Sequence, residues 1–306
     1  MIFIANDEGR CGVPTAAKFL AEGNDSLRSI IEGIKLVESN STIRTVGKGG
    51  WPNILGEVEL DSSVMDGDTL RTGAVGSLRG YAHAVEVAYE IMQRLQYEIV
   101  VGAGAERFAH DIGAESCENL IADSKEVWEQ HLEKVLNDTE KKNFPNVPLY
   151  KINSVAVDPE KCFDTTVYLA KGMNSKISVA ASTSGWGWKH PGRLGDSPII
   201  GGGAYADSRY GACACTHTGE MTIRAGTARS VVLYMKMGMT VEEAVYEAAK
   251  DLKSLKGGYL DEVTIHAIDK NDNYKVISYK GSVPVFYWVF KDGMESPVKE
   301  QAEYID

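Results

Sequence analysis

The chain has 306 residues, and 43 acidic against 32 basic side chains give it a formal net charge of -11. The hydrophobic share of 43% and the charged share of 25% are ordinary for a folded protein and exclude a mostly disordered chain. The acidic balance argues against a nucleic-acid partner, which needs a basic face. No apolar run approaches the roughly 18 residues of a membrane-spanning helix, so no membrane partner is expected. Because the start lacks a basic region and a long apolar stretch, we expect a cytoplasmic protein.

The first half of the chain predicts helices interleaved with short strands. Hydrophobic spacing and helix-start residues indicate helices after Pro14, around Ile30 to Val37, over 82–95 and over 122–135. Short strands are expected at 2–5, 57–60 and 99–101, the last of them buried. The glycines after residue 101 favour a tight strand-to-helix turn. A dinucleotide-binding loop is disfavoured because Arg107 stands where the third glycine of that pattern belongs.

Residues 137–150 are polar and contain two prolines, which predicts an exposed linker that continues to about residue 164. Two helices are expected in the second half, and Thr240 with Glu243 forms a capping box at the start of the second. Strands are expected at 165–170, 176–183, 212–216, 262–268, 274–279 and 285–290. This order predicts strand layers that are covered by helices.

Cys213, Cys215 and His217 alternate, so a strand would place all three on one face. Alternate residues on a strand lie roughly 6.5–7 Å apart, whereas ligands about 2.3 Å from one zinc ion must crowd closer. We therefore expect the two cysteines to be small buried hydrophobic side chains, and we expect no metal and no cofactor. The five cysteines do not indicate a disulfide framework. The absence of a G-x-S-x-G motif disfavours an α/β-hydrolase serine.

Candidate reactive side chains gather in the stretch that follows the linker. Taken singly, each has an ordinary explanation: Arg193 and Asp196 as a salt bridge within a loop, and the threonines as strand residues. The stretch contains Asp164-Thr165, Thr183, Gly192-Arg193, Gly195-Asp196-Ser197-Pro198 and Thr216-His217-Thr218-Gly219-Glu220.

Taken together, these motifs resemble the glycosylasparaginase family, within the plant-type asparaginase and isoaspartyl peptidase superfamily of N-terminal nucleophile hydrolases. The resemblance covers nearly the whole chain after about residue 14. Gly49-Gly50-Trp51-Pro52-Asn53 and Glu59-Leu60-Asp61 look more like glycosylasparaginases than like plant-type asparaginases.

The resemblance implies an α+β fold, a four-layer αββα sandwich of the N-terminal nucleophile hydrolase type, formed by residues 1–306 as a single domain. It also implies a precursor that cuts itself between Asp164 and Thr165, the two autoprocessing residues. The products would be an alpha chain of residues 1–164 and a beta chain of residues 165–306. A homodimer of the processed units is expected.

The resemblance also implies three catalytic threonines. Thr165 would be the nucleophile, and its freed α-amino group, with an ordinary pKa of about 7.7–8, would be the general base. Thr183 would support the nucleophile. Thr216, with the backbone N–H of the next residue, would hold the oxyanion.

By the same resemblance, four residues bind substrate. Arg193 would bind the α-carboxylate and Asp196 the α-ammonium, with help from the carbonyl of Gly219. His217 stands where the family usually has glycine, so its imidazole is expected in the leaving-group pocket.

The expected partner is a small-molecule substrate, and the expected enzyme is a self-processing amidohydrolase. It would release aspartate from N4-glycosylated asparagine or from asparagine. The alternative within the class is an isoaspartyl dipeptidase. An alternative from another class is a relative that does not process itself and only binds an amino-acid-like ligand.

Overall fold

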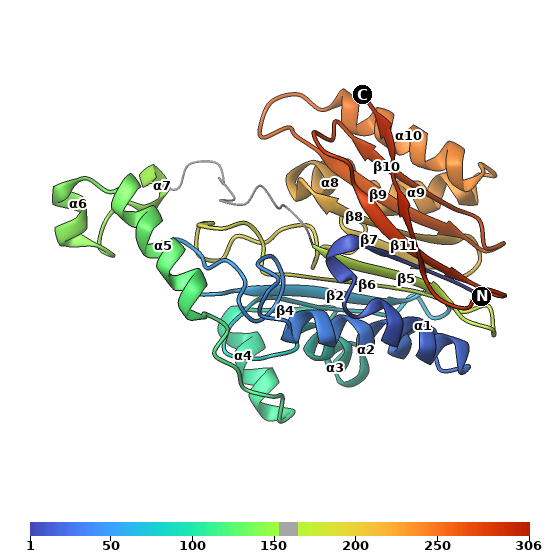
Figure 1. Ribbon diagram of the computed structural model, residues 1–306, viewed down its shortest axis with the longest axis horizontal. Coiled ribbons are helices and arrows are strands. Elements are labelled where there is room, and N and C mark those ends of the chain that lie inside the picture. The colour runs from blue at the N-terminus through green and yellow to red at the C-terminus, as the bar shows by residue number, and fades with distance from the viewer. Residues whose placement is uncertain (153–164) are drawn as a thin grey trace.

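A computed structural model describes residues 1–152 and 165–306, so Asp164 of the expected cleavage site lies outside the described residues. These two ranges fold into two β-sheets and a set of helices (Figure 1). Within them, no helix has both the length and the apolar character that crossing a membrane requires.

The larger sheet has eight strands, and all neighbours pair antiparallel except β3 and β4. Its order is β12 (Val298–Gln301), β11 (Phe286–Lys291), β1 (Ile2–Asn6), β5 (Thr166–Lys171), β6 (Ile177–Thr183), β2 (Leu60–Asp66), β3 (Thr72–Leu78) and β4 (Ile99–Val101). The smaller sheet has the order β13 (Glu303–Ile305), β10 (Tyr274–Tyr279), β9 (Val263–Asp269), β8 (Gly211–His217) and β7 (Ala204–Asp207).

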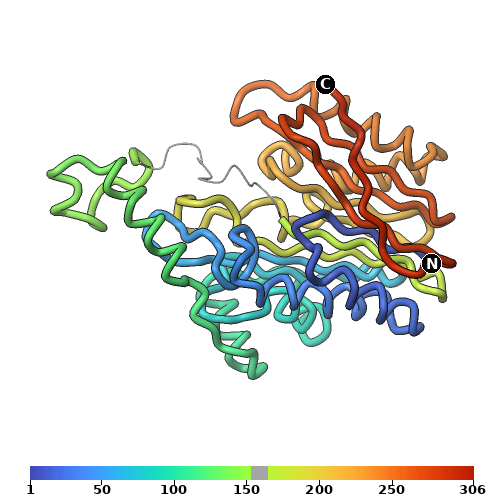
Figure 2. Tube along the Cα trace, in the orientation of Figure 1, coloured from blue at the N-terminus to red at the C-terminus, as the bar shows by residue number. Residues whose placement is uncertain are grey.

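Two groups of helices pack on these sheets, and a third projects from the body (Figures 1 and 2). The larger sheet contacts α1 (Val13–Ala21), α2 (Ser26–Ser39), α3 (Ala84–Arg94) and α4 (Gly102–Asp111), and a short 3-10 turn (Asp7–Gly9) precedes them. The smaller sheet contacts α8 (Gly219–Ala225), α9 (Thr227–Lys236) and α10 (Val241–Ser254). The projecting helices are α5 (Ala122–Val135), α6 (Asp138–Asn143) and α7 (Leu149–Ile152).

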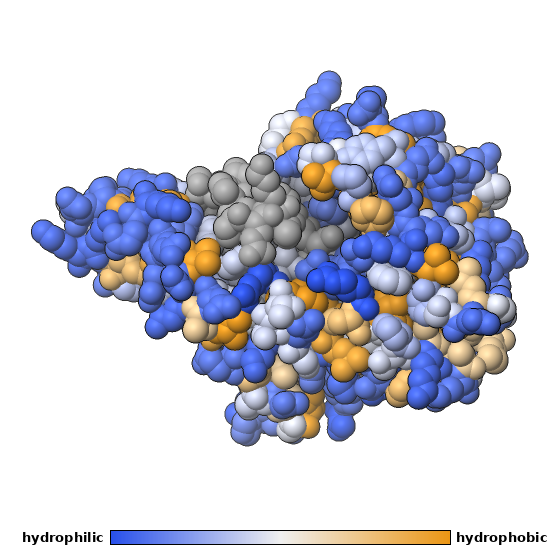
Figure 3. Space-filling view, in the orientation of Figure 1, coloured by the Kyte–Doolittle hydropathy of each residue, from blue (hydrophilic) through white to orange (hydrophobic). Residues whose placement is uncertain are grey.

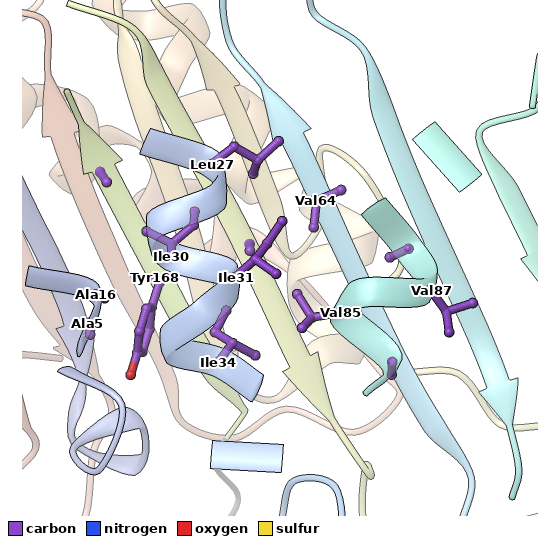
Figure 4. Packing of buried hydrophobic residues seen from close by; sticks show 14 of the residues in the cluster. Ala5, Ala16, Leu27, Ile30, Ile31, Ile34, Val64, Val85, Val87 and Tyr168 are labelled. Atoms are coloured by element: carbon purple, nitrogen blue, oxygen red, sulfur yellow. The ribbon is translucent and has the colours of Figure 1, made fainter. Parts of the chain in front are cut away.

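Alternation along the strands of the larger sheet supplies two separate cores. Phe3 and Ala5 of β1 pack with the helices, whereas Ile2 and Ile4 pack with residues of the smaller sheet. Figure 4 shows the helical side of this arrangement, where side chains of α2 and α3 gather over the strands. Apolar side chains on both faces explain why several strands read as continuous hydrophobic runs.

The smaller sheet is also apolar on both faces. Cys213 and Cys215 are buried among residues of α9 and α10, as the sequence predicted. Ala212 and Ala214, which alternate with them, pack against the larger sheet instead. Strands β8 and β9 therefore lie between the helices and the larger sheet, where β8 contacts β5 and β6 and β9 contacts β1.

Some predicted elements differ from the structure for identifiable reasons. The expected strand at 57–60 begins only at Leu60, because the Asn53 side chain accepts hydrogen bonds from the backbone N–H groups of Leu55 and Glu57 and holds a turn there. Strand β4 exists where expected but is not buried, since Ile99 and Val101 are 43% and 48% exposed.

In the second half, three helices replace the expected two. Gly226 has a left-handed backbone (φ 60°), which separates α8 from α9. The capping box of Thr240 and Glu243 at the start of α10 is confirmed.

The segment expected as a linker contains α6 and α7, and α6 begins with a capping box formed by Asn137 and Glu140. No residue of 137–152 is buried, in agreement with the expected exposure. Figure 3 shows mostly hydrophilic side chains over this projection. Short helices arise here because local capping offsets the cost of their free ends.

Candidate active site

A small pocket lies where three strands of the two sheets begin or end. Thr165 directly precedes β5, Thr183 is the last residue of β6, and His217 is the last residue of β8. The loop from Gly185 to Ser197 closes the remaining side. The pocket is lined by Thr45, Thr165, Thr183, Gly185, Trp186, Arg193, Gly195, Asp196, Ser197, His217 and Gly219.

Thr165 is held in the pocket by a side chain from the start of the chain. The Asn6 amide donates to the Thr165 carbonyl over 2.5 Å, and its oxygen accepts from the Val167 N–H over 3.0 Å. The Ser197 hydroxyl lies 3.5 Å from the Thr165 hydroxyl. Thr165 is 8% exposed, so its hydroxyl faces a small, largely enclosed space.

Thr183 fixes the backbone that follows β6. Its hydroxyl donates to the Thr45 carbonyl over 3.2 Å and accepts from the Gly185 N–H over 2.9 Å. Both partners of Thr183, Thr45 and Gly185, also line the pocket. Thr183 therefore shapes the wall beside Thr165 and lines the pocket with it.

Arg193 is oriented by two neighbours. Its Nε and Nη2 donate to Oε1 of Glu220 over 3.1 and 2.7 Å, and its guanidinium lies 4.3 Å from the centre of the Trp186 ring. The preceding residue is anchored as well, since the Gly192 N–H donates to the buried carboxylate of Glu59. The alternative salt bridge between Arg193 and Asp196 is not among the ion pairs of the described residues, where Arg193 pairs with Glu220.

Asp196 is a buried carboxylate beside Arg193. It is 4% exposed, and Thr222 Oγ1 lies 2.6 Å from its Oδ2 and 2.9 Å from the Gly219 carbonyl. Burial raises the pKa of Asp196 to about 6, although the Thr222 hydrogen bond and the Arg193 charge oppose the shift. A side chain at Gly219 would stand 2.8 Å from Asp196 Oδ1, so this close approach requires glycine.

His217 also lines the pocket. Its Nδ1 lies 3.0 Å from Thr216 Oγ1, and its Nε2 lies 3.4 Å from Oε1 of Glu262. The backbone of His217 is left-handed, with φ of 79°. Thr216 is 1% exposed and is not among the described residues that line the pocket, whereas the neighbouring His217 is.

The structure thus brings six of the predicted site residues to one pocket and Thr216 next to it. Sequence reasoning missed several residues that hold them. Ser197 and Glu220 lie inside the motifs given above, so the sequence offered a reason to choose them. Asn6, Thr45 and Glu262 lie far from those motifs along the chain. The residues that sequence reasoning missed are Asn6, Thr45, Trp186, Ser197, Glu220, Thr222 and Glu262.

Comparisons with known proteins identify related sequences. The sequence profile of the family described as asparaginase matches residues 11–269. The isoaspartyl peptidase/L-asparaginase of Danio rerio is 34% identical over 245 residues, which cover 78% of this chain and 73% of that protein. The N(4)-(beta-N-acetylglucosaminyl)-L-asparaginase of Elizabethkingia miricola is 31% identical, covering 87% and 78%. The plant-type L-asparaginase of Thermococcus kodakarensis is 31% identical, covering 89% and 85%.

Proposed function

We propose a function that starts from the family of the chain, which belongs to the asparaginase family of amide hydrolases within the N-terminal nucleophile superfamily. The proposal is that the chain cleaves itself before Thr165 and then hydrolyses the side-chain amide of an asparagine derivative. The observation that carries the proposal is the position of Thr165. Thr165 lines a pocket that is also lined by Arg193, Asp196 and His217.

The amino-acid end of the pocket fits the α-carboxylate and α-ammonium of a free amino acid. A guanidinium offers a carboxylate two parallel hydrogen bonds, and a buried carboxylate suits an ammonium group. Arg193 and Asp196 would bind these two groups, with the Gly219 carbonyl beside the ammonium. This leaves the side-chain amide of the substrate directed toward Thr165.

The reaction would proceed in two halves. The Thr165 hydroxyl adds to the amide carbon while the α-amino group of Thr165 takes the hydroxyl proton. The tetrahedral intermediate then expels the amine, which receives that proton, and leaves an aspartyl ester on Thr165. Water hydrolyses the ester, so aspartate is released and the threonine hydroxyl is restored. Thr216 and the backbone N–H of His217 would stabilise the oxyanion in both halves, while Thr183 keeps the wall beside Thr165 in place.

Several features of the whole chain belong to the same proposal. The two-sheet arrangement with helices on each sheet supports an αββα sandwich. Self-cleavage would give chains of residues 1–164 and 165–306, with the segment of about 137–164 as the flexible linker before the cut. The processed units would form a homodimer.

The amine that leaves is either that of an N4-linked sugar, ammonia or a peptide. The relatives' names include glycosylasparaginase, L-asparaginase and isoaspartyl peptidase, so all three leaving groups occur among them. An isoaspartyl dipeptidase is therefore the second candidate. His217, which occupies the leaving-group end, would narrow the choice among them.

Intact mass after purification tests the nucleophile. The wild-type chain should yield two chains of about 18 and 15 kDa, given an average composition. Thr165→Ala should yield one chain, because it has no hydroxyl to attack the preceding bond. Thr166→Ala is the matched control, since it makes the same change one residue further along, and it should still split.

The same samples are then assayed with glucosaminyl-asparagine, asparagine and β-aspartyl dipeptides. Hydrolysis of one of them by the wild-type protein, and of none by Thr165→Ala, is expected. Cleavage of the Thr165→Ala chain at the same bond would contradict the nucleophile assignment. A wild-type protein that stays in one piece and binds asparagine without hydrolysis would instead support a binding relative.

A further inference from the structure

We propose that Ser197 is a further catalytic residue, whose hydroxyl donates a hydrogen bond to Thr165 Oγ1 and stabilises this oxygen as it leaves the aspartyl ester. The inference rests on the proposed function, which makes Thr165 Oγ1 the reacting oxygen. Ser197 Oγ lies 3.5 Å from Thr165 Oγ1, and both residues line the pocket.

The Ser197 hydroxyl is buried and directed at one atom. Ser197 is 1% exposed. Within residues 1–152 and 165–306, its Oγ takes part in one hydrogen bond, as the donor to Thr165 Oγ1. A buried hydroxyl without an acceptor lowers the stability of the fold, so buried polar groups are nearly always paired. The nucleophile oxygen is therefore the acceptor that the fold gives to the Ser197 hydrogen.

The backbone around Ser197 is fixed, which holds its side chain in the pocket. The Ser197 carbonyl accepts a hydrogen bond from Ser63 Oγ of β2. The Ile199 N–H donates to the Asp196 carbonyl over 2.8 Å, which closes a turn around Ser197. A Cβ on Gly203 would stand 2.4 Å from that same carbonyl, so the chain before β7 packs closely on the turn. The turn thus brings two consecutive residues, Asp196 and Ser197, to the pocket.

The contact is longer than the usual separation of about 2.7–2.8 Å between two neutral hydroxyls. It therefore stabilises little while Thr165 Oγ1 is neutral, as it is in the free enzyme and in the aspartyl ester. Hydrogen bonds from a hydroxyl to an anionic oxygen shorten to about 2.5–2.7 Å and are roughly twice as strong. Ser197 thus favours states in which Thr165 Oγ1 is negatively charged, and such selective stabilisation accelerates a reaction.

Thr165 Oγ1 becomes negatively charged when its bond to the substrate carbon breaks. In hydrolysis of the ester, water gives a proton to the Thr165 α-amine and adds to the carbon. The bond between carbon and Oγ1 then breaks, its electron pair returns to Oγ1, and the α-ammonium gives the proton back to this oxygen. Ser197 keeps its own proton throughout and stabilises the charge on Oγ1 while it develops.

Formation of the ester from an amide should depend less on Ser197. The difficult step there is expulsion of the amine, when Thr165 Oγ1 is already bonded to carbon and is neutral. Loss of the Ser197 hydroxyl should therefore slow the second half of the reaction much more than the first.

The test measures the two halves separately in processed Ser197→Ala. The kcat/KM for asparagine, or for whichever amide the wild type hydrolyses, reports the steps up to amine release. Exchange of oxygen-18 from water into the side-chain carboxylate of aspartate reports formation and hydrolysis of the ester without any amine. We expect kcat/KM to fall by less than about threefold and the exchange rate by about 10- to 150-fold, which is the effect of one charge-assisted hydrogen bond.

Ser63→Ala is the matched control, because it removes a buried hydroxyl that bonds to the Ser197 carbonyl instead of to the nucleophile. Both of its rates should stay within about threefold of the wild type. Equal falls of the two rates in Ser197→Ala, or an unchanged exchange rate, would overturn the inference, as would an equal loss of exchange in Ser63→Ala. A wild type that hydrolyses an amide but exchanges no oxygen would instead count against the Thr165 ester and the proposed function.

Self-cleavage provides a readout that needs no added substrate. Thr165 Oγ1 would add to the Asp164 carbonyl and displace the amide nitrogen, which takes the hydroxyl proton and leaves an ester. Water would then hydrolyse this ester with the same departure of Oγ1. Ser197→Ala should therefore cleave more slowly and leave part of the precursor as the ester.

Neutral hydroxylamine distinguishes the two forms of an uncleaved chain, because it splits an ester before Thr165 and leaves a peptide bond intact. We expect it to split part of the uncleaved Ser197→Ala chains. Uncleaved Ser197→Ala chains that all resist hydroxylamine would contradict the inference, as would cleavage at the wild-type rate. A wild-type chain that stays uncleaved and resists hydroxylamine would count against self-cleavage itself.

Discussion

Two parts of the candidate site are built differently. In the part proposed to bind the amino-acid group, which we call the amino-acid end, Arg193 and Asp196 come from a loop and are held by Glu220 and Thr222 of helix α8. In the part proposed to hold the oxyanion, which we call the oxyanion end, Thr216 and His217 end a strand, and Glu262, which precedes the neighbouring strand, lies beside His217. In both places a glutamate that does not line the pocket contacts a nitrogen-containing side chain that does: Glu220 contacts Arg193, and Glu262 contacts His217.

The difference lies in what the glutamate controls. Glu220 holds the planar guanidinium of Arg193, which always carries its charge, so this contact affects orientation alone. Glu262 lies beside the imidazole of His217, whose two nitrogens can each donate or accept, so loss of this contact would change the hydrogen bonding of the ring as well as its orientation. Damage at the amino-acid end should therefore appear mainly in substrate binding, and damage at the oxyanion end mainly in kcat.

The largest effect is expected for Asp196→Asn. If Asp196 binds the substrate ammonium as proposed, loss of its buried charge costs about 2–5 kcal/mol, which corresponds to a roughly 30- to 5,000-fold lower kcat/KM. Steady-state kinetics of the fully processed variant measure this. A kcat/KM within threefold of the wild type would remove Asp196 from the substrate site.

The same substitution should stabilise the fold. Burial raises the Asp196 pKa from 3.8 to about 6 in the folded protein, so the ionised group opposes folding. The wild type has the full stability from this group below pH 3.8 and loses it as the pH rises through about 6. Asp196→Asn avoids this loss, so its free energy of unfolding at pH 8 should exceed that of the wild type by up to about 3 kcal/mol.

Urea unfolding at pH 8 and at pH 4 measures the difference between Asp196→Asn and the wild type. The advantage of the variant should shrink toward pH 4. A variant that is less stable than the wild type at pH 8 would mean that the Thr222 hydrogen bond outweighs the cost of burying the charge.

Arg193→Lys should have the next largest effect on kcat/KM. The charge is kept, but an ammonium cannot make the two parallel bonds that a guanidinium offers a carboxylate. Losing one charge-assisted bond of about 1.5–3 kcal/mol lowers kcat/KM by about 10- to 150-fold. Self-cleavage should be nearly unaffected because it does not involve the substrate carboxylate. Wild-type kinetics in processed Arg193→Lys would leave Arg193 with only its salt bridge to Glu220.

Glu220→Gln should have a smaller effect, confined to binding. Glu220 is partly exposed, and such ion pairs contribute about 0.2–1 kcal/mol, so KM should rise at most about fivefold with kcat nearly constant. Measured side by side, Glu220→Gln and Glu262→Gln sharpen the contrast between the two ends. A fall in kcat without a change of KM in Glu220→Gln would contradict the proposed difference between the two ends.

The smallest effect is expected for Ser278→Ala at the oxyanion end. It removes one 3.3 Å contact to Glu262 but leaves the Ser282 N–H and the carboxylate charge in place. We expect kcat to fall by at most about twofold, because the remaining contacts keep Glu262 beside His217 and only part of the roughly 0.5–1.5 kcal/mol of the lost hydrogen bond affects the pocket. A loss as large as that of Glu262→Gln would mean that fixing the carboxylate matters more than its charge.

Local pattern was enough to predict most helices and strands. The stripe of Val241 to Leu252 and the Thr240 capping box define α10, and the apolar runs at 166–171 and 177–183 define two central strands. Strand β3 was missed because its two glycines weaken the strand pattern. The burial of β4 was mispredicted because a sequence does not tell which strand will lie at the edge of a sheet.

The sequence by itself determined the motif residues of the site, from Thr165 to Gly219, and through them the family. These residues lie close together in the chain, and their order is visible without a fold. Only the tertiary structure decided that Arg193 pairs with Glu220 rather than with Asp196, that Asn6 holds Thr165, and that Glu262 reaches His217. The physical reason is that helical and strand patterns repeat within a few residues, whereas an ion-pair partner is fixed by strand register and loop closure between distant segments.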